Sequence, residues 1–209
     1  MPARIPATAV GRLSIYLRTI EKSKQAKIQT ISSSQLAEQS GVNPSQVRKD
    51  LAYFGQFGKR GAGYKIDSLL TNLKKILGVN KNWDIVLIGV GNLGSALLAY
   101  PGFKKEGFKI SAAFDNNLLK IGKRLERIQV QDVEKIDEFL KKEKIRIGII
   151  ATPAKEAQNV ADRLINGGVK AILNFAPITI SAPRGIKVMD VDLTVCLENL
   201  VFHLTHNRK

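Results

Sequence analysis

The pattern of apolar and polar residues changes near position 82. Before this position, apolar residues recur at the spacing of a helix face and predict amphipathic helices over 9–21 and 66–77. After it, short apolar runs alternate with helical segments, which is typical of βαβ units. We therefore predict two domains, 1–82 and 83–190, followed by a separate C-terminal helical segment, 191–209.

The second predicted domain has the pattern of a parallel sheet that is covered by helices on both faces. Continuous apolar runs such as 145–151 suit strands that are buried on both sides. The fold class that follows is α/β, with a Rossmann-like doubly wound parallel sheet. The expected strands are 84–88, 109–114, 128–130, 145–151, 170–174 and 186–189. The expected helices are 92–100, 117–123, 132–143, 154–167 and 192–205.

A helix-turn-helix signature follows the first amphipathic helix. Ser32 and Gln35 have the spacing of a capping box at the start of a short helix, which Gly41 would end. Asn43 is a good N-cap residue and Pro44 a good first residue for the next helix. Two helices joined by a short glycine-containing turn predict a helix-turn-helix unit.

The second helix of this unit has an apolar and a polar face. Val47, Leu51 and Phe54 share the face that would be buried. Arginine and lysine can reach guanine in the major groove and glutamine can pair with adenine, so the other face predicts DNA contacts. An exposed basic pair on an ordinary surface helix is the alternative. The candidate DNA-binding residues are Ser45, Gln46, Arg48 and Lys49, together with Arg12, which lies outside the apolar stripe of the first helix.

A glycine-rich segment, 55–65, comes directly after this helix and carries Lys59 and Arg60. Its glycines predict a tight β-hairpin with a basic tip. In a winged helix-turn-helix domain such a loop enters the minor groove, so Lys59 and Arg60 are further candidate DNA-binding residues. An ordinary flexible loop is the alternative.

The charge distribution agrees with a nucleic-acid partner. The net charge is +15, and residues 1–82 hold 14 Lys and Arg against 4 Asp and Glu, which leaves +10 in this segment. A compact basic segment suits a polyanion partner. A solvated basic surface is the alternative, and charge alone does not decide between the two.

The sequence also indicates a cellular compartment. No apolar run approaches the roughly 18 residues of a membrane span, and the N-terminus lacks the apolar core of a signal peptide. Cys196 stands alone, which leaves no intramolecular disulfide and no cysteine metal cluster. We therefore expect a cytoplasmic protein with no membrane association.

The sequence from Asp84 to Asp115 has the order of a dinucleotide-binding fingerprint. Gly89 would make a tight turn, Gly91 would let the backbone approach a pyrophosphate, and Gly94 would allow the helix to pack closely on the strand. Asp115, at the end of the second strand, would accept hydrogen bonds from ribose hydroxyls and repel a 2′-phosphate, so NAD(H) is favoured over NADP(H). Glycine turns with only a structural role are the alternative.

Further ligand contacts are expected where later strands end. Ligands of doubly wound sheets bind outside the carboxyl ends of the strands, which nominates residues that follow two of the later strands. Tyr100 closes the first helix after the turn and need not touch the nucleotide of its own subunit. The full set of candidate cofactor-binding residues is Gly89, Val90, Gly91, Asn92, Leu93, Gly94, Asp115, Lys120, Tyr100, Thr152, Pro153, Asn174, Phe175 and Pro177.

Catalytic residues to accompany this cofactor site are missing from the sequence. The only histidines are His203 and His206, and no Ser/His/Asp set, HExxH motif or Walker loop is present. We infer that NADH and NAD⁺ are signals rather than reagents, with no catalytic residue and no metal site. One alternative is a small NAD-dependent oxidoreductase with a basic N-terminal dimerisation domain. Another is a DNA-binding protein whose nucleotide fold only holds a dimer together.

The last predicted helix needs a surface to pack against. It follows a complete sheet and carries the apolar residues Leu193, Leu197, Leu200, Val201 and Leu204. A two-fold partner suits a helix-turn-helix protein, because such proteins usually read paired half-sites. Packing against the chain's own sheet is equally open. Cys196 on this helix is expected to be buried.

Several separated motifs, in this order, resemble the redox-sensing transcriptional repressor Rex family, and the resemblance covers essentially the whole chain. The most specific motifs are Gln46–Leu51 with Tyr53–Gly55, Arg60–Gly61 with Gly63–Tyr64, Gly89–Gly94, Tyr100–Phe103 and Asn174–Pro177. The resemblance implies a homodimer with N-terminal winged-helix domains and a C-terminal helix swapped between subunits. It also implies that NADH closes the dimer into a form that cannot span its operator, an inverted repeat, whereas NAD⁺ competes and leaves DNA binding intact.

The resemblance also implies roles for particular residues. Arg48 and Lys49 occupy recognition-helix positions, and Arg60 lies in the basic wing. Residues that couple nucleotide state to domain arrangement in the family correspond here to Arg18, Tyr100 and Asp192. Leu193 departs from the pattern, because some relatives carry a phenylalanine near the nicotinamide at this position.

Overall fold

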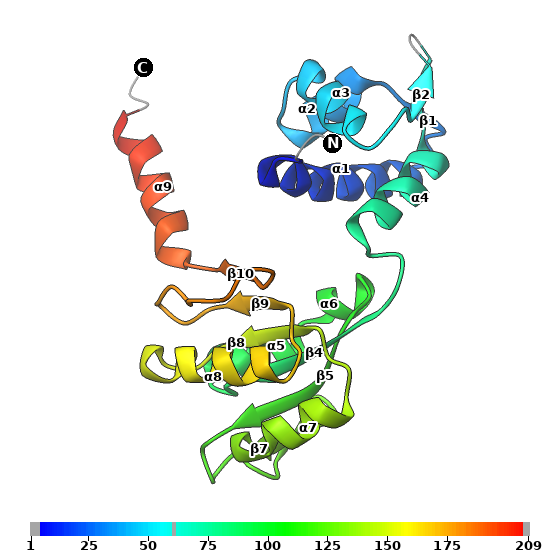
Figure 1. Cartoon of the computed structure of the whole chain (residues 1–209). Coiled ribbons are helices and arrows are strands. Elements are labelled where there is room, and N and C mark those ends of the chain that lie inside the picture. The colour runs from blue at the N-terminus through cyan, green and yellow to red at the C-terminus, as the bar shows by residue number, and fades with distance from the viewer. Residues whose placement is uncertain (1–4, 60–61, 207–209) are drawn as a thin grey trace. The chain divides into compact units, whose positions relative to one another are not determined.

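The structure, a computed structural model, describes residues 5–59 and 62–206 (Figure 1). The chain divides into two compact units, Met1–Lys81 and Asn82–Lys209. The first unit has one hydrophobic core and the second has two, so each unit is described by itself.

The first unit is a helical domain with a small antiparallel sheet, in the strand order β1-β3-β2. Its elements are α1 (Ala7–Gln25), β1 (Thr30–Ile31), α2 (Ser33–Ser40), α3 (Pro44–Ala52), β2 (Gly58–Lys59), β3 (Gly63–Lys65) and α4 (Ile66–Leu77).

The helix signals that define the helix-turn-helix act as expected. The Ser32 N–H donates to Gln35 Oε1 (2.9 Å) and the Gln35 N–H donates to Ser32 Oγ (3.1 Å), which completes the capping box of α2. Gly41 ends α2 in the left-handed region at φ 67°. Asn43 Oδ1 accepts from the Gln46 N–H (2.8 Å) at the start of α3. The predicted helix-turn-helix is therefore present.

The core of this unit forms between α1, α4 and the inner face of α3. Leu13, Tyr16 and Ile20 of α1 are fully buried, and Val47 and Leu51 of α3 join them. β2 and β3 form the predicted hairpin, in which Gly58 lies opposite Tyr64 and Lys59 opposite Gly63. The predicted tip residues Arg60 and Gly61 lie outside the described residues.

The second unit is a seven-stranded sheet with helices on both faces. Its elements are β4 (Trp83–Ile88), α5 (Asn92–Ala99), α6 (Pro101–Lys105), β5 (Phe108–Asp115), β6 (Arg124–Leu125), β7 (Ile128–Asp132), η1 (Val133–Lys135), α7 (Ile136–Lys142), β8 (Ile147–Ile150), α8 (Ala154–Asn166), β9 (Ala171–Asn174), β10 (Lys187–Asp190) and α9 (Leu193–His206).

The strand order of this sheet is that of a doubly wound fold. The order is β10-β9-β8-β4-β5-β7-β6, and all neighbouring pairs except β6–β7 are parallel. The chain runs outward from β4 through β5 to β7 and then returns to place β8 on the other side of β4. The switch in direction therefore falls between β4 and β8, where ligands of such sheets bind.

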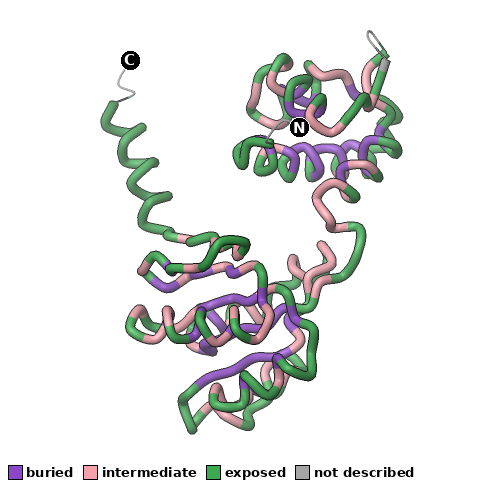
Figure 2. The backbone as a smooth tube through the Cα atoms, viewed as in Figure 1, coloured by how far each residue is buried: buried purple, intermediate pink, exposed green. Residues whose placement is uncertain are grey.

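Alternation along β4 divides the apolar residues between the two faces of the sheet. Val86 and Ile88 pack with α7 and α8, whereas Ile85 and Leu87 belong to the cluster that includes α5 and α6. Both clusters are buried, and Figure 2 shows buried residues, in purple, along the central strands. The predicted α/β fold, with its winged helix-turn-helix and Rossmann-like domains, is confirmed.

Two predicted helices differ in the structure. The segment 117–123 is not a helix but a series of turns, because Asn117 Oδ1 accepts from the Leu119 N–H (2.9 Å) and Gly122 has φ 85°. The helix predicted over 92–100 ends at Ala99, and Pro101 starts the separate helix α6 after an extended Tyr100.

The C-terminal helix does not pack against the described part of its own unit. Every residue of α9 is exposed, so the alternative in which it packs on its own sheet is wrong (Figure 2). The expectation that Cys196 is buried is also wrong for the single chain, since this cysteine is exposed for the same reason. No helix in the described ranges combines the length and apolar character that crossing a membrane requires.

Candidate functional site

A hollow of about 510 Å³ opens where β4 and β8 end, at the switch point of the sheet. The glycine-rich turn after β4 forms one side, and the segment after β8 forms another. The residues predicted to bind the cofactor that line it are Gly89, Gly91, Asn92, Leu93, Asp115, Lys120, Thr152 and Pro153. Residues far apart in the sequence are thus brought to one place, although their binding roles remain predictions.

The three glycines of the turn are needed for different structural reasons. Gly89 has φ 92°, and a Cβ there would lie 2.5 Å from the carbonyl oxygen of Ala151 on the neighbouring strand. A Cβ on Gly94 would overlap the carbonyl oxygen of Gly89, so α5 can approach the turn only with glycine here. Gly91 has open space in front of it and lines the hollow. This is the geometry expected for backbone that approaches a phosphate.

Two helices begin at the edge of this hollow without a side-chain cap. α5 starts after Gly91 and α8 after Pro153, and neither N-cap residue makes a side-chain hydrogen bond to the helix. The first N–H groups of an α-helix have no partner within the helix and carry a partial positive charge. The hollow can therefore hold an anionic group such as a pyrophosphate.

Asp115, the last residue of β5, also lines the hollow and is 6% exposed. Burial by itself raises the pKa of this carboxyl. Hydrogen bonds from the N–H groups of Asn117 (2.8 Å) and Val90 (2.7 Å), and from Lys120 Nζ (3.2 Å), outweigh burial and hold the pKa below its usual value. Asp115 is therefore ionised, and it also fixes the glycine turn through Val90.

Thr152 supplies a polar group to the hollow. Among the side chains that the structure describes, its Oγ1 is the one buried polar atom without a hydrogen-bond partner. Leaving such a group unpaired costs about 1–3 kcal/mol, which a ligand with a matching polar atom would recover. The sequence named Thr152 from its place after a strand, and the structure adds this reason.

A second hollow, of about 400 Å³, adjoins the first through Leu93, which lines both. The segment after β9 provides Phe175 and Pro177, two of the predicted cofactor-binding residues, whose binding roles stay predictions. The end of β10 and the start of α9 provide Asp192 and Leu193. Asp192 also accepts a hydrogen bond from the Thr194 N–H (2.8 Å) at the start of α9.

Four predicted cofactor residues do not line either hollow, and one of them is Gly94, which lies against the Gly89 carbonyl. Val90 is buried and acts through its N–H, which bonds Asp115. Asn174 is fully buried, and its side chain is bonded within the protein. Tyr100 is 57% exposed and packs edge-on against Phe103, with ring centroids 5.2 Å apart. The predicted contact of Asn174 with a ligand stays a prediction, and in this structure the Asn174 side chain is used by partners within the protein.

Other residues of the larger hollow escaped the sequence analysis. They are Asn116 and Asn117 after β5, Glu134 in η1, and Glu156, Asn159 and Arg163 on α8. Residues 156, 159 and 163 have the spacing of one helix face, so the sequence could have predicted that they lie together on α8. Arg163 is held by Asp137 (2.9 Å). In the described ranges no group of His, Cys, Asp and Glu could hold a metal ion.

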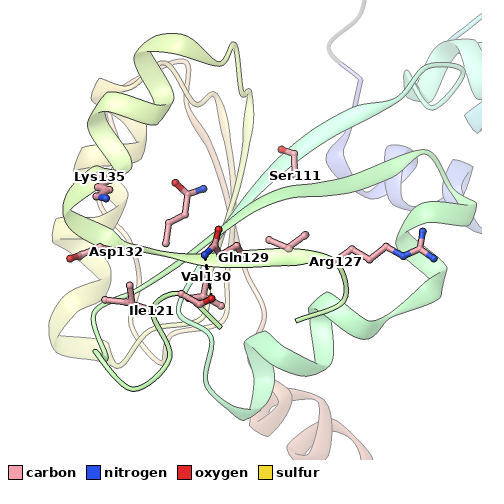
Figure 3. A pocket seen from close by; sticks show the side chains of 10 residues that line it. Ser111, Ile121, Arg127, Gln129, Val130, Asp132 and Lys135 are labelled. Carbon is pink, nitrogen blue, oxygen red and sulfur yellow. Dashed lines mark hydrogen bonds between the residues drawn. The ribbon is translucent and has the colours of Figure 1, made fainter. Parts of the chain in front are cut away.

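A third hollow, of about 390 Å³, runs along β7 (Figure 3). Its two basic residues, Arg127 and Lys135, lie at opposite ends of the view, with Gln129 and Val130 between them. The charges do not converge on one point, so this hollow is not a candidate anion site.

The predicted DNA-reading face is exposed on α3. Ser45, Arg48 and Lys49 are all exposed, and Arg48 Nη1 donates to Ser33 Oγ on α2 (3.0 Å). Lys59 lies in β2 of the hairpin, and Arg60 lies outside the described residues. The arrangement places basic side chains on a helix that can enter a major groove, while each DNA contact remains a prediction.

Arg12 and Gln46, two further predicted DNA contacts, have a partner inside the protein. The fully buried Asp50 carboxylate accepts from Arg12 Nε (2.6 Å) and Nη2 (2.8 Å), from Tyr16 Oη (2.8 Å) and from Gln46 Nε2 (2.7 Å). Burial by itself raises the pKa of Asp50, but these hydrogen bonds lower it below its usual value. Asp50 thereby ties α3 to α1, a role the sequence analysis missed.

Comparison with known proteins identifies the family of the chain. Residues 4–52 match the family described as "Putative DNA-binding protein N-terminus", and residues 80–178 match the CoA binding domain. The redox-sensing transcriptional repressor Rex of Carboxydothermus hydrogenoformans is 49% identical over 96% of this chain and 97% of its own length. The Rex of Desulforamulus reducens is 48% identical over 99% and 98%. The chain belongs to the Rex family.

Solved Rex structures share the whole architecture. The Rex-family repressor RSP in complex with β-NAD⁺ and operator DNA superposes with a TM-score of 0.92 at 39% identity, over 97% of this chain and 93% of that one. RSP in complex with β-NADH gives a TM-score of 0.88 at 38% identity, over 96% and 94%. The agreement includes both units, so the Rex fold is present throughout.

Proposed function

We propose that this chain is a DNA-binding transcriptional repressor that senses the NADH/NAD⁺ ratio. NADH closes the dimer and releases operator DNA, whereas NAD⁺ leaves the protein able to bind. One observation carries this proposal. The same chain contains a nucleotide-sized hollow at the switch point of a parallel sheet and a basic helix-turn-helix. Support comes from the Rex relatives, one of which has been solved with NADH and also with NAD⁺ and operator DNA.

The two adjoining hollows suit the two halves of a dinucleotide. The pyrophosphate would lie at Gly91 and the start of α5, where the backbone is open and uncapped. The adenosine ribose would lie against Asp115, with Lys120 beside it, and Asn92, Thr152 and Pro153 would complete this half. The nicotinamide would enter the hollow lined by Leu93, Phe175 and Pro177.

Operator DNA would be read by the exposed face of α3. Arg48 and Lys49 would reach base edges or phosphates, and Ser45 would contact the backbone. Lys59 and Arg60, the residues of the predicted basic wing, would enter the minor groove. Because one such unit covers a half-site, a dimer would read an inverted repeat.

The homodimer would form through α9. Its apolar residues, among them Leu197, Leu200 and Val201, are exposed in the described part of their own unit, and exchange of the helix between subunits would bury them. Arg18, Tyr100 and Asp192 would couple nucleotide state to domain arrangement. Asp192 is suited to this because it both lines the nicotinamide hollow and caps α9.

In this proposal NADH is an effector and the chain is not an enzyme. The proposed location of the protein is the cytoplasm. A small NAD-dependent oxidoreductase is the alternative. The exposed His203 and His206 lie on α9, away from the residues that line the two hollows, which favours the effector role. Sustained NADH oxidation with a panel of carbonyl substrates would support the enzyme instead.

The experiment that tests the repressor proposal is a DNA-binding titration. The full-length protein is first used to select inverted-repeat duplexes from a randomised library. The affinity for a selected duplex is then measured by fluorescence anisotropy with NADH, with NAD⁺ and with neither. We expect NADH to weaken binding by about 5- to 150-fold, the usual range of allosteric coupling. Equal affinity with and without saturating NADH would contradict the proposal.

A further inference from the structure

Asn174, the last residue of β9, holds an unusually complete set of hydrogen bonds. The two hydrogens of its Nδ2 are shared among three acceptors, Asp190 Oδ1 (2.8 Å) and the carbonyl oxygens of Ile178 (2.8 Å) and Ala176 (3.2 Å), and its Oδ1 accepts from the Ala176 N–H (3.0 Å). Three acceptors surround the nitrogen, and the reversed amide would put oxygen against all of them. The orientation of this amide is therefore fixed by its neighbours.

These bonds join the two walls of the nicotinamide hollow. One wall is 175–179, which follows β9, and the other is 190–193, which ends β10 and starts α9. The backbone adds a further link, because the Val191 N–H donates to the carbonyl oxygen of Asn174 (2.8 Å). Asn174 is fully buried and lines neither wall, but it contacts both.

The bond to Asp190 is not needed to hold β10 in the sheet. The strand is already paired with β9 along its whole length, from Lys187 opposite Ala171 to Asp190 opposite Asn174. The side-chain bond is added at the end of this ladder, on an otherwise exposed residue. A cross-link at that point fixes the direction in which the chain leaves the strand.

The chain leaves that strand directly into α9. Asp192, two residues after Asp190, accepts from the Thr194 N–H at the start of the helix. Every residue of α9 is exposed, so within the described part of its own unit the helix is oriented by the segment that precedes it. A displacement of the Asp190 end of β10 would therefore change the orientation of α9.

We propose that Asn174 is a positioning residue that transmits occupancy of the nicotinamide hollow to α9 through Asp190. This rests on the proposed function, in which the nicotinamide ring enters that hollow. A ring that pushes on 175–179 moves the carbonyl groups of Ala176 and Ile178. These carbonyls share the Asn174 amide with Asp190, so the amide cannot stay bonded to both walls without moving them together.

The test breaks the link at its exposed end, which spares the buried amide. Asp190→Ala removes the acceptor, and Asp190→Asn keeps an acceptor oxygen without the charge. Asp162→Ala is the matched control, because Asp162 is an exposed carboxylate that likewise accepts from a side-chain amide, Gln158 Nε2 (2.9 Å), and lines neither hollow. All variants are studied as full-length protein.

Three quantities are measured for each variant: NADH affinity by calorimetry, affinity for the selected duplex without nucleotide, and the ratio of duplex affinities without and with saturating NADH. For Asp190→Ala, the affinity for the duplex without nucleotide is expected to stay within about twofold of the unmutated protein, and its NADH affinity is measured so that the ratio is taken at saturation. Its ratio is expected to fall by about 2- to 30-fold, the range reported for residues that carry coupling. Asp190→Asn and Asp162→Ala are expected to keep most of the ratio.

Different outcomes overturn different claims. An unchanged ratio in Asp190→Ala overturns the role of Asn174 while the repressor proposal stands. So does loss of the dimer in Asp190→Ala, measured by light scattering, because the bond would then hold the assembly together rather than transmit a signal. An unmutated protein whose DNA binding ignores NADH overturns both proposals at once.

Discussion

The guanidinium of Arg12 and the carboxylate of Asp50 meet in two hydrogen bonds, 2.6 and 2.8 Å long, across 38 residues of sequence. The carboxylate is fully buried, whereas about a quarter of the Arg12 side chain remains exposed. This pair, with Gln46 as a further donor, fixes the helix that carries the predicted DNA contacts. The reading face is therefore pre-organised before DNA arrives.

Replacing Asp50 with asparagine is expected to destabilise the first unit by about 1.5–3 kcal/mol, the usual value of a hydrogen bond to a charged group. The pKa of Asp50 is lowered in the folded protein, so its contribution is complete above the unfolded value of about 3.9 and is lost as pH falls through the lowered pKa. Urea unfolding followed by circular dichroism between pH 7 and pH 2 should show a shallower acid decline in Asp50→Asn. A decline as steep as in the exposed control Asp67→Asn would contradict this.

Arg48→Ala and Lys49→Ala are each expected to weaken operator binding by about 5- to 150-fold, the discrimination that a good base contact provides. NADH affinity should be unchanged, since both residues belong to the first unit. Lys75→Ala removes the same charge from an exposed position on α4 and serves as the control. Equal effects of Lys49→Ala and Lys75→Ala in anisotropy titrations would mean that only the net charge matters.

Asp115→Ala is expected to lower NADH affinity and to narrow the preference for NADH over NADPH. Two causes act together: the ribose loses an acceptor, and the Val90 N–H loses the carboxylate that holds the glycine turn. Calorimetry with both nucleotides measures the preference. Asp132→Ala, at the paired position on β7 but outside the larger hollow, is the control. An unchanged preference would remove Asp115 from the ribose site.

Gly91→Ala and Gly94→Ala are expected to fail in different ways. Space is open at Gly91, so its variant should fold with normal thermal stability but bind NADH at least about tenfold more weakly, because the methyl group occupies the phosphate position. At Gly94 the methyl group meets the Gly89 carbonyl, so both stability and binding should fall. Thermal unfolding and calorimetry on the same samples separate the two; normal NADH binding by Gly91→Ala would place the pyrophosphate elsewhere.

Features with local causes could be predicted from the sequence. The capping box of Ser32 and Gln35, the left-handed Gly41 and the N-cap Asn43 each depend on residues within one turn, and together they define the helix-turn-helix. The glycine fingerprint is also local, and it correctly located the turn between β4 and α5.

Features that depend on distant partners were missed. Asp50 looked like an ordinary helix residue because its partners Arg12 and Tyr16 lie on another helix. Asn174 was assigned to the ligand because it follows a strand, but its amide is used by residues up to 16 positions away. The false helix over 117–123 has a mixed origin, since Asn117 forms a local turn and the Gly122 N–H bonds Val130 on β7 (2.8 Å).

The exposure of α9 has a consequence for how the protein matures. A helix of 14 residues is only marginally stable in water by itself, and every residue of this one is exposed within the described part of its unit. In the proposed dimer its order is acquired together with a second copy, so the last step of folding would be bimolecular. The fraction of assembled protein, and with it the sensitivity of the proposed switch, would then depend on the concentration of the chain in the cell.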